Sequence, residues 1–395
     1  MNLLLPKGTR MLHIGPPKTG TTTLQLAFHH NRPALKRHGV HYAGKGRQPM
    51  SAALAAASNK IVPGHPADSL KAWPKLLKEV KSSSADRVVV CSEFFSNADD
   101  ETARSIVEQL GDDRTHVVIT LRPLVKIIPS QWQQYVQDYM RFSYDAWLDA
   151  MFNKTGSTKI SPNFWRRHRH DQLVERWAAA VGRDNLTVVV LDESDPKMLL
   201  RTFEQMLGLP EETLVPHDES ANRSLTLGEI EMLRAFNQQF REQGWSREDY
   251  NRIARFGSNR FLKEREPGKD EQRLTTPQWA VDRALALTAE MVPNIASSGV
   301  RIVGDLSRLE SPPALHTVGD LPAEICVPPD AAARQAIGVA RSTRGTGSVD
   351  APAATSPALR RTIDDTGTRE LVGIVRQRIA GKVGSRLPRR DGAKG

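Results

Sequence analysis

The sequence predicts an α/β protein built on an open parallel sheet flanked by helices, and three observations lead to this prediction. The runs RVVVCS, THVVITL and NLTVVVL, at residues 87–92, 115–121 and 185–191, are almost continuously apolar and rich in valine. Such runs are typical of parallel strands that are buried on both faces. Segments with helical spacing of apolar residues separate them. Hydrophobic residues make up 39% of the 395 residues, which is enough for a sizeable core.

The first strand and the first helix are expected near the N-terminus. MLHIG at residues 11–15 is a short apolar run ending in glycine, and a helix is predicted from Thr21. Pro33 interrupts this helix, Gly39 ends its continuation, and VHY at residues 40–42 is expected to be extended. Later crossover helices are expected at residues 70–82, 102–110, 130–140 and 172–181.

Aromatic residues suggest where the folded domain ends. Trp279 is the last Phe, Tyr or Trp of the chain, and a short closing segment, GVRIVGDLSRL, follows its helix. Beyond about residue 312, Pro, Gly, Ala, Ser and Arg dominate. We therefore expect one domain at residues 1–310 and a mostly disordered basic tail at residues 311–395. Short helices are expected within the tail at residues 329–341 and 367–383, the second of them amphipathic and basic.

Charge and composition narrow the class of partner. The formal net charge is +10 and the pI is about 9.7, which suits a polyanion such as a phosphorylated nucleotide, an anionic lipid, a sulfated glycan or nucleic acid. No nucleic-acid module surrounds the basic stretch FWRRHRH, so nucleic acid is not expected. Two cysteines argue against a disulfide-stapled secreted scaffold. No run resembles a signal peptide or a membrane span. We expect a cytoplasmic protein. Three alternatives are open for the tail helix: it contacts an anionic membrane, docks on the protein's own domain, or does not form.

The most informative segment is GPPKTGTT at residues 15–22, between the first strand and the first long helix. Gly15 and Gly20 allow backbone conformations in which several amides converge on one anion. Gly20, Thr21 and Thr22 open a helix, whose N-terminus attracts negative charge. Lys18 adds a cation at the apex of the loop, and the threonine hydroxyls add donors. A phosphate-binding loop explains these residues better than a plain glycine turn does.

The spacing of this loop distinguishes two kinds of phosphate ligand. Nucleotide triphosphatases carry GxxxxGK[ST], but Thr21 stands here where that lysine belongs, and the lysine has moved to position 18. HIGPPKTGTTTLQ instead resembles the 5′-phosphosulfate-binding loop of sulfotransferases that use 3′-phosphoadenosine 5′-phosphosulfate (PAPS), especially bacterial ones. The resemblance covers about residues 10–310. It implies a fold like that of P-loop nucleotide hydrolases, PAPS as co-substrate, and contacts from Lys18, Thr19, Gly20, Thr21 and Thr22.

Three further positions match the pattern of that family. THVVITLRPLVKIIPSQW supplies Arg122 after a strand and Ser130 eight residues later, where the resemblance implies binding of the 3′-phosphate. We expect Ser130 to open a helix and to act there as an N-cap. ESANRSLT resembles a loop that closes over the nucleotide and makes Arg223 its cationic candidate, although a salt bridge at the entry of the next helix explains Arg223 equally well.

Sulfuryl transfer also needs a base and a cation for the leaving phosphate. Lys18 is the candidate for the cation because it lies in the loop that would hold the 5′-phosphate. Glu93 is the candidate base, since it follows the strand at 87–92 and SEFFSN resembles the site of a catalytic glutamate in the family. The competing base is a histidine: His13, expected within the first strand, or His116, expected to be exposed. No metal is required, because the donor carries no polyphosphate.

The sequence thus favours a sulfotransferase that acts on a hydroxyl of a carbohydrate, glycolipid or small metabolite. A P-loop kinase or ATPase is the first alternative, since TVVVLDE places Asp192 after a strand, where it would bind magnesium. A nucleotide-binding scaffold without catalytic activity is the second. The acceptor itself has no signature in the sequence.

Overall fold

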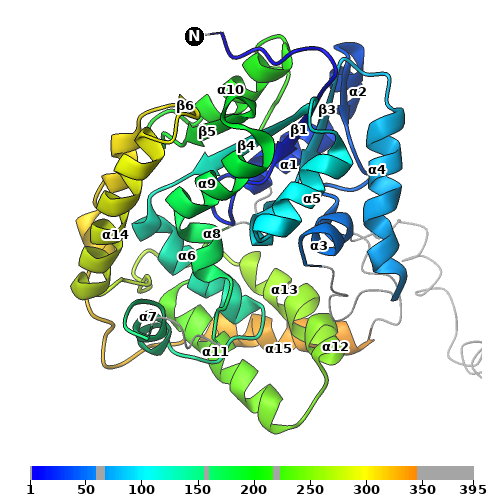
Figure 1. The fold of residues 1–395 in the computed structure, drawn as a ribbon. Helices are drawn as coiled ribbons and strands as arrows, with labels where there is room; N and C mark the ends of the chain where they lie inside the picture. Colours follow the sequence, from blue (N-terminus) through cyan, green and yellow to red (C-terminus); the bar gives the residue numbers. More distant parts are fainter. Residues whose placement is uncertain (1, 59–66, 155–159, 217–222, 345–395) are drawn as a thin grey trace, which may run out of the picture. The chain divides into compact units, whose positions relative to one another are not determined.

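Six parallel strands form the central sheet of the computed structural model, in the order β2-β3-β1-β4-β5-β6 (Figure 1). The strands are Thr9–His13 (β1), Val40–Tyr42 (β2), Arg87–Cys91 (β3), Thr115–Leu121 (β4), Leu186–Val190 (β5) and Arg301–Val303 (β6). The structure describes residues 2–58, 67–154, 160–216 and 223–344. The predicted open parallel α/β sheet is confirmed.

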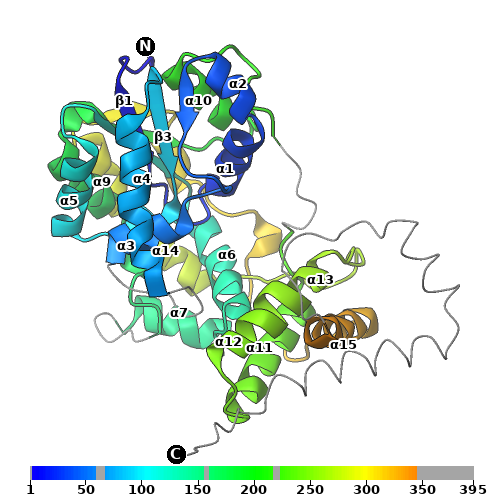
Figure 2. The same cartoon turned by 90° about the vertical axis from the view of Figure 1, so that its right-hand side faces the viewer.

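Helices cover both faces of the sheet, because successive strand residues point to opposite sides. One face, with Met11, Val89 and Val118, packs against three helices: α1 (Thr21–His30), α2 (Arg32–Arg37) and α10 (Met198–Leu207). The other face, with Leu12 and Val90, packs against five: α3 (Met50–Ser58), α4 (Ala72–Ser82), α5 (Asp100–Leu110), α9 (His170–Val181) and α14 (Gln278–Ala296). Figure 2 shows α1, α2 and α10 on one side of β1 and β3, and α4, α5 and α9 on the other.

Further helices gather at one end of the sheet (Figures 1 and 2). They are α6 (Leu124–Gln137), α7 (Tyr144–Phe152), α8 (Phe164–His168), α11 (Leu227–Glu242), α12 (Arg247–Tyr250), α13 (Asn259–Lys263) and α15 (Pro329–Arg344). A π-helical segment, η5 (Asn251–Ser258), joins α12 to α13. Because β4 leads directly into α6, this group adjoins the carboxyl ends of the strands. None of the described helices is long and apolar enough to cross a bilayer.

Helix α6 differs from the prediction, because it begins at Leu124 and contains Pro129 instead of starting after it. A proline inside a helix removes one backbone hydrogen bond and is usually a boundary. Here Leu124, Ile127 and Ile128 are fully buried. Their burial stabilises the first turns by more than the proline costs. Ser130 therefore lies within the helix and is not its N-cap.

The packed part of the chain also extends past the expected boundary at residue 310. The helix expected at residues 329–341 forms as α15 and packs on η5 and α13. The packing is close: a Cβ on Gly338 would lie 2.6 Å from Cα of Ser258, and a Cβ on Gly257 would lie 1.9 Å from Oγ of Ser342. The glycines at these positions explain why a segment without aromatic residues docks. The amphipathic helix expected at residues 367–383, like all of residues 345–395, lies outside the described residues.

Four buried histidines should make the fold sensitive to acid. Burial lowers the pKa of His13 to about 3 and the pKa values of His116 and His170 to about 4. The pKa of His168 is also lowered by burial, and then by neighbouring His170 and Arg167. Below pH 6.5 the unfolded chain binds protons that the folded chain does not, so the free energy of unfolding falls as the pH drops toward 4.

We expect each of these histidines to cost about 2 kcal/mol of stability between pH 6.5 and pH 5, as an upper bound. Urea denaturation followed at both pH values measures the loss. Replacing the fully buried His168 by Phe should flatten the pH dependence, whereas His38→Asn, at an exposed position, should leave it unchanged. Equal pH dependence in wild type and His168→Phe would contradict this account.

Candidate functional site

Charged side chains from four neighbouring strands meet at the carboxyl edge of the sheet. The strands β3, β1, β4 and β5 are adjacent in that order. The segments that follow them carry Glu93, Lys18, Arg122 and Glu193, respectively. In open α/β sheets, ligands bind outside this edge. The parallel topology therefore places the predicted loop, the predicted base and the predicted 3′-phosphate contact side by side.

The loop after β1 has the geometry that its glycines predict. A Cβ on Gly15 would lie 2.1 Å from Oγ1 of Thr120 and 2.7 Å from Nε2 of His13, so a larger residue would have to displace these two side chains. Gly20 has a φ of 82° and directly precedes α1, which begins at Thr21. The left-handed conformation turns the chain so that the first amides of α1 are free to meet an anion.

The three threonine hydroxyls of the loop have different roles. Thr19 is fully buried and its hydroxyl donates to the carbonyl of Pro16 at 2.7 Å, while Thr120 Oγ1 lies 2.9 Å from it. Thr21 is also buried and donates to the carbonyl of Gly15 at 3.4 Å. These two hydroxyls hold the loop, so only their backbone amides remain for a ligand. The side chain of Thr22 is exposed, and its hydroxyl is available.

Lys18 is held in an unusual backbone conformation at the apex of this loop. Its φ of 71° is in the left-handed region, which costs a non-glycine residue about 1–3 kcal/mol. Its Nζ donates to Oε1 of Gln134 in α6 at 3.1 Å, and no ion pair with a described carboxylate forms. Burial, and then the nearby Lys263, lower the pKa of Lys18 to about 8, against the opposing effect of Asp138 and Glu93.

Lys263, at the end of α13, is a residue of the site that the sequence did not indicate. It is half-buried, and burial and the nearby Arg223 lower its pKa. Its charge acts on Lys18, so two desolvated ammonium groups lie near one another. Like charges so placed repel one another unless an anion lies between them. No local pattern marks Lys263, because only the packing of α13 brings it to the loop.

Glu93 opens the short 3-10 helix η2 (Glu93–Asn97) that follows β3. It is half-buried, and its Oε2 accepts a hydrogen bond from Nε2 of Gln25 in α1 at 2.8 Å. Nε2 of Gln25 also lies 3.2 Å from Oε1 of Gln48, to which the hydroxyl of Ser92 donates at 3.0 Å. In the described part of the chain no hydrogen bond engages Oε1 of Glu93. The carboxylate is thus oriented on one oxygen and open on the other.

Arg122 follows β4 as predicted, whereas Ser130 lies inside α6. Arg122 Nε donates to Oε1 of Glu193 at 2.8 Å, and Lys126 Nζ lies 2.5 Å from Oε2 of the same carboxylate. The hydroxyl of Ser130 donates to the carbonyl of Lys126 at 3.2 Å, inside α6. Since residues four apart share a helix face, Lys126, Ser130 and Gln134 form a line from the Arg122 cluster to Lys18. Neither Lys126 nor Glu193 was predicted.

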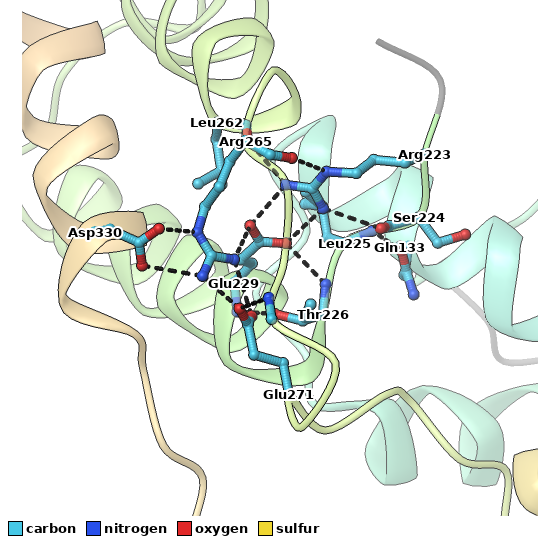
Figure 3. Close-up of polar contacts among 11 residues, drawn as sticks. Gln133, Arg223, Ser224, Leu225, Thr226, Glu229, Leu262, Arg265, Glu271 and Asp330 are labelled. Atoms are coloured by element: carbon cyan, nitrogen blue, oxygen red, sulfur yellow. Dashed lines mark hydrogen bonds and ion pairs between the residues drawn. The ribbon is translucent and has the colours of Figure 1, made fainter. Parts of the chain in front are cut away.

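Arg223 takes the structural role that the sequence left open. Its guanidinium pairs with Glu229 at 2.7 Å through each terminal nitrogen, and Glu229 completes a capping box with Thr226 at the start of α11 (Figure 3). Arg265 joins the fully buried Glu229 to Glu271 and to Asp330 of α15. The carboxylate of Glu229 and backbone carbonyls therefore occupy the guanidinium of Arg223, and Asp330 connects α15 to the same cluster.

Other candidates named from the sequence lie in the core or in other contacts. Trp132, Gln133 and Gln137 of α6 are buried, whereas Gln134 of the same helix contacts the loop through Lys18. His116 was expected to be exposed, which is wrong: it is buried and lies 2.8 Å from Oγ1 of Thr187. Asp192 accepts from Ser194 and pairs with Arg308 at 2.7 Å. No described group of His, Cys, Asp and Glu has a geometry suited to a metal ion.

Comparison with known proteins gives a distant similarity. No family model matches the sequence, and no curated protein matches it. Among solved structures, a sulfotransferase from Alicyclobacillus acidocaldarius is similar, with 17% sequence identity and a TM-score of 0.38. The match covers 61% of this chain and 94% of that chain. A similarity of this extent assigns no role to any residue, so the roles proposed below depend on the geometry of the site.

Proposed function

We propose that this protein is a sulfotransferase that transfers a sulfuryl group from PAPS to a hydroxyl of a carbohydrate, glycolipid or small-metabolite acceptor. The pair Lys18 and Lys263 is the observation that carries the proposal. Two half-buried ammonium groups that lie near one another, without a carboxylate partner among the described residues, need an anion, and Lys18 lies in the loop that leads into the N-terminus of α1. The open carboxylate of Glu93 lies on the neighbouring strand end.

The reaction is a single displacement at sulfur. Glu93 takes the proton of the acceptor hydroxyl as the oxygen of that hydroxyl forms a bond to sulfur. The bond between sulfur and the bridging oxygen of the donor breaks, and adenosine 3′,5′-bisphosphate leaves with the electron pair. Lys18 donates a hydrogen bond to this oxygen as its charge develops, and Lys263 adds a second cation. Gln134 keeps the Lys18 side chain directed toward α6 until the donor binds.

Metal-free nucleotide binding tests the proposal most directly. We expect adenosine 3′,5′-bisphosphate to bind in calorimetry with EDTA present, and radiolabelled sulfate to pass from PAPS to hydroxyl acceptors in a cell extract. Magnesium-dependent ATP turnover without PAPS binding would overturn the proposal in favour of a kinase or ATPase. PAPS binding with no transfer to any acceptor would leave a nucleotide-binding scaffold.

Arg122→Ala should weaken donor binding through the 3′-phosphate. A charge-assisted contact of this kind contributes about 1.5–3 kcal/mol, so the affinity for adenosine 3′,5′-bisphosphate should fall about 10- to 150-fold. The loss should be smaller for adenosine 5′-monophosphate, which lacks the 3′-phosphate. Calorimetry with both nucleotides measures the difference, and equal losses would refute the assignment.

Glu193 supplies a matched control for this assignment. Its carboxylate occupies both Arg122 and Lys126, so it competes with any phosphate for the same donors. We expect Glu193→Gln to tighten the binding of adenosine 3′,5′-bisphosphate and to leave adenosine 5′-monophosphate almost unaffected. The exposed Arg37→Gln, which removes a charge from α2, should change neither affinity.

A further inference from the structure

One arginine beside Glu93 has an open guanidinium edge. Arg167, in α8, is half-buried, and its Nε donates to Oδ1 of Asn97 at 2.5 Å. Asn97 is the last residue of η2, the same short helix that begins with Glu93. Neither terminal nitrogen of Arg167 makes a hydrogen bond or an ion pair with any described residue. The contact with Asn97 therefore fixes the plane of the guanidinium and leaves its outer edge unoccupied.

Other half-buried arginines nearby, unlike Arg167, have a carboxylate partner. Arg169 pairs with Asp171 at 3.0 Å, and Arg176 pairs with Asp100 at 3.1 Å. Burial lowers the pKa of Arg167, while neighbouring Tyr135 and Glu93 oppose that shift. A desolvated guanidinium without a counter-ion is costly, and a bound anion would offset the cost. The two outer nitrogens have the geometry that grips a carboxylate, phosphate or sulfate in pairs.

Arg167 lies beside the short helix that carries the proposed base. Glu93 and Asp138 act on the charge of Arg167 and also on the charge of Lys18. Arg167, however, is anchored on η2, whereas Lys18 lies in the loop after β1. Glu93 thus lies near two cations: Lys18, in the loop proposed to bind the donor, and Arg167, anchored on the short helix that Glu93 opens.

We infer that Arg167 binds an anionic group of the acceptor, so that the substrate is a hydroxyl compound already bearing a carboxylate, phosphate or sulfate. This inference rests on the proposed sulfotransferase function. Arg167 holds the anion through its two terminal nitrogens, and the acceptor hydroxyl then lies at the free oxygen of Glu93. The charge on Arg167 selects anionic acceptors over neutral ones with the same hydroxyl.

The test uses full-length protein, labelled PAPS and an extract of the source organism's cells. The extract is separated into water-soluble anions, anionic lipids and neutral compounds. We expect sulfate transfer to one of the two anionic fractions, and the fraction that is labelled tells a soluble acceptor from a lipid headgroup. Arg167→Gln should raise the KM for the labelled acceptor about 10- to 150-fold with a smaller change in kcat. Arg167→Lys should recover part of the loss.

The affinity for adenosine 3′,5′-bisphosphate separates failure of this inference from failure of the proposed function. Arg167→Gln and the control Arg37→Gln should both bind the nucleotide as wild type does, which also shows that they fold. If Arg167→Gln does not fold, the KM of Arg167→Lys for the acceptor is compared with that of Arg37→Gln. A higher KM in Arg167→Lys supports the inference, and equal values overturn it. Transfer to neutral compounds alone, or an unchanged KM in a folded Arg167 variant, overturns the inference and leaves the sulfotransferase proposal standing. Absence of both nucleotide binding and transfer overturns both.

Discussion

Glu93→Gln should lower the rate of sulfuryl transfer about 10²- to 10⁴-fold while the affinity for adenosine 3′,5′-bisphosphate stays near that of wild type. Glutamine keeps the size of the side chain and can still pair with Gln25, so the local structure is retained. It cannot accept the proton of the acceptor hydroxyl. Steady-state transfer of labelled sulfate together with calorimetry measures the two quantities on the same preparation.

The alternative bases are poorly placed to replace Glu93. His13 is fully buried, with its Nδ1 3.0 Å from Sγ of Cys91 and its Nε2 3.1 Å from Oγ1 of Thr120. Burial also lowers its pKa to about 3. Nε2 of the buried His116 is hydrogen-bonded to Oγ1 of Thr187. A near-native rate in Glu93→Gln would therefore contradict the proposed base, and His13→Gln would then test the remaining histidine directly.

Lys18→Met should lower turnover more than it lowers donor affinity. The lysine is proposed to meet charge that appears only as the bridging bond breaks, and removing one such donor costs about 10²- to 10³-fold in kcat. The hydrogen bond to Gln134 is lost, but the loop is held independently by Gly15 and Thr19. Lys263→Met is the variant to compare with Lys18→Met, because it removes a neighbouring positive charge without changing a residue of the loop.

The lowered pKa of Lys18 predicts a pH dependence with a defined sign. Lys18 is charged below pH 8 and neutral above it, and a bound polyanion favours the charged form. Donor binding should therefore weaken as the pH rises through about 8, and proton uptake should accompany binding near that pH. Calorimetry in two buffers of different ionisation enthalpy measures the uptake. A donor affinity that stays constant from pH 7 to pH 9.5 would contradict this role of Lys18. So would a Lys18→Met variant in which kcat and donor affinity fall by the same factor.

Elements with a strong local signal were predicted well. The valine-rich strands, the loop at residues 15–22 and the start of α1 at Thr21 agree with the structure, because burial on both faces and a glycine turn each leave a mark on neighbouring residues. Helix α6 shows the limit of this reasoning. Pro129 gave a local signal for a boundary, and the burial of Leu124 and Ile127 overrode it.

The alternation of strands and helices, read from the sequence alone, determines that Glu93, the Lys18 loop and Arg122 follow strands of one parallel sheet, and parallel strands present their carboxyl ends at one edge. Tertiary packing alone decided which charged side chains meet at that edge and which of them have ion-pair partners. The packing of α13 brings the charge of Lys263 near Lys18, and Glu193 pairs with Arg122 and Lys126. The outer nitrogens of Arg167 have no partner among the described residues. The physical reason is that these contacts join segments far apart in the chain, whose approach depends on how helices pack and leaves no periodic pattern in the sequence.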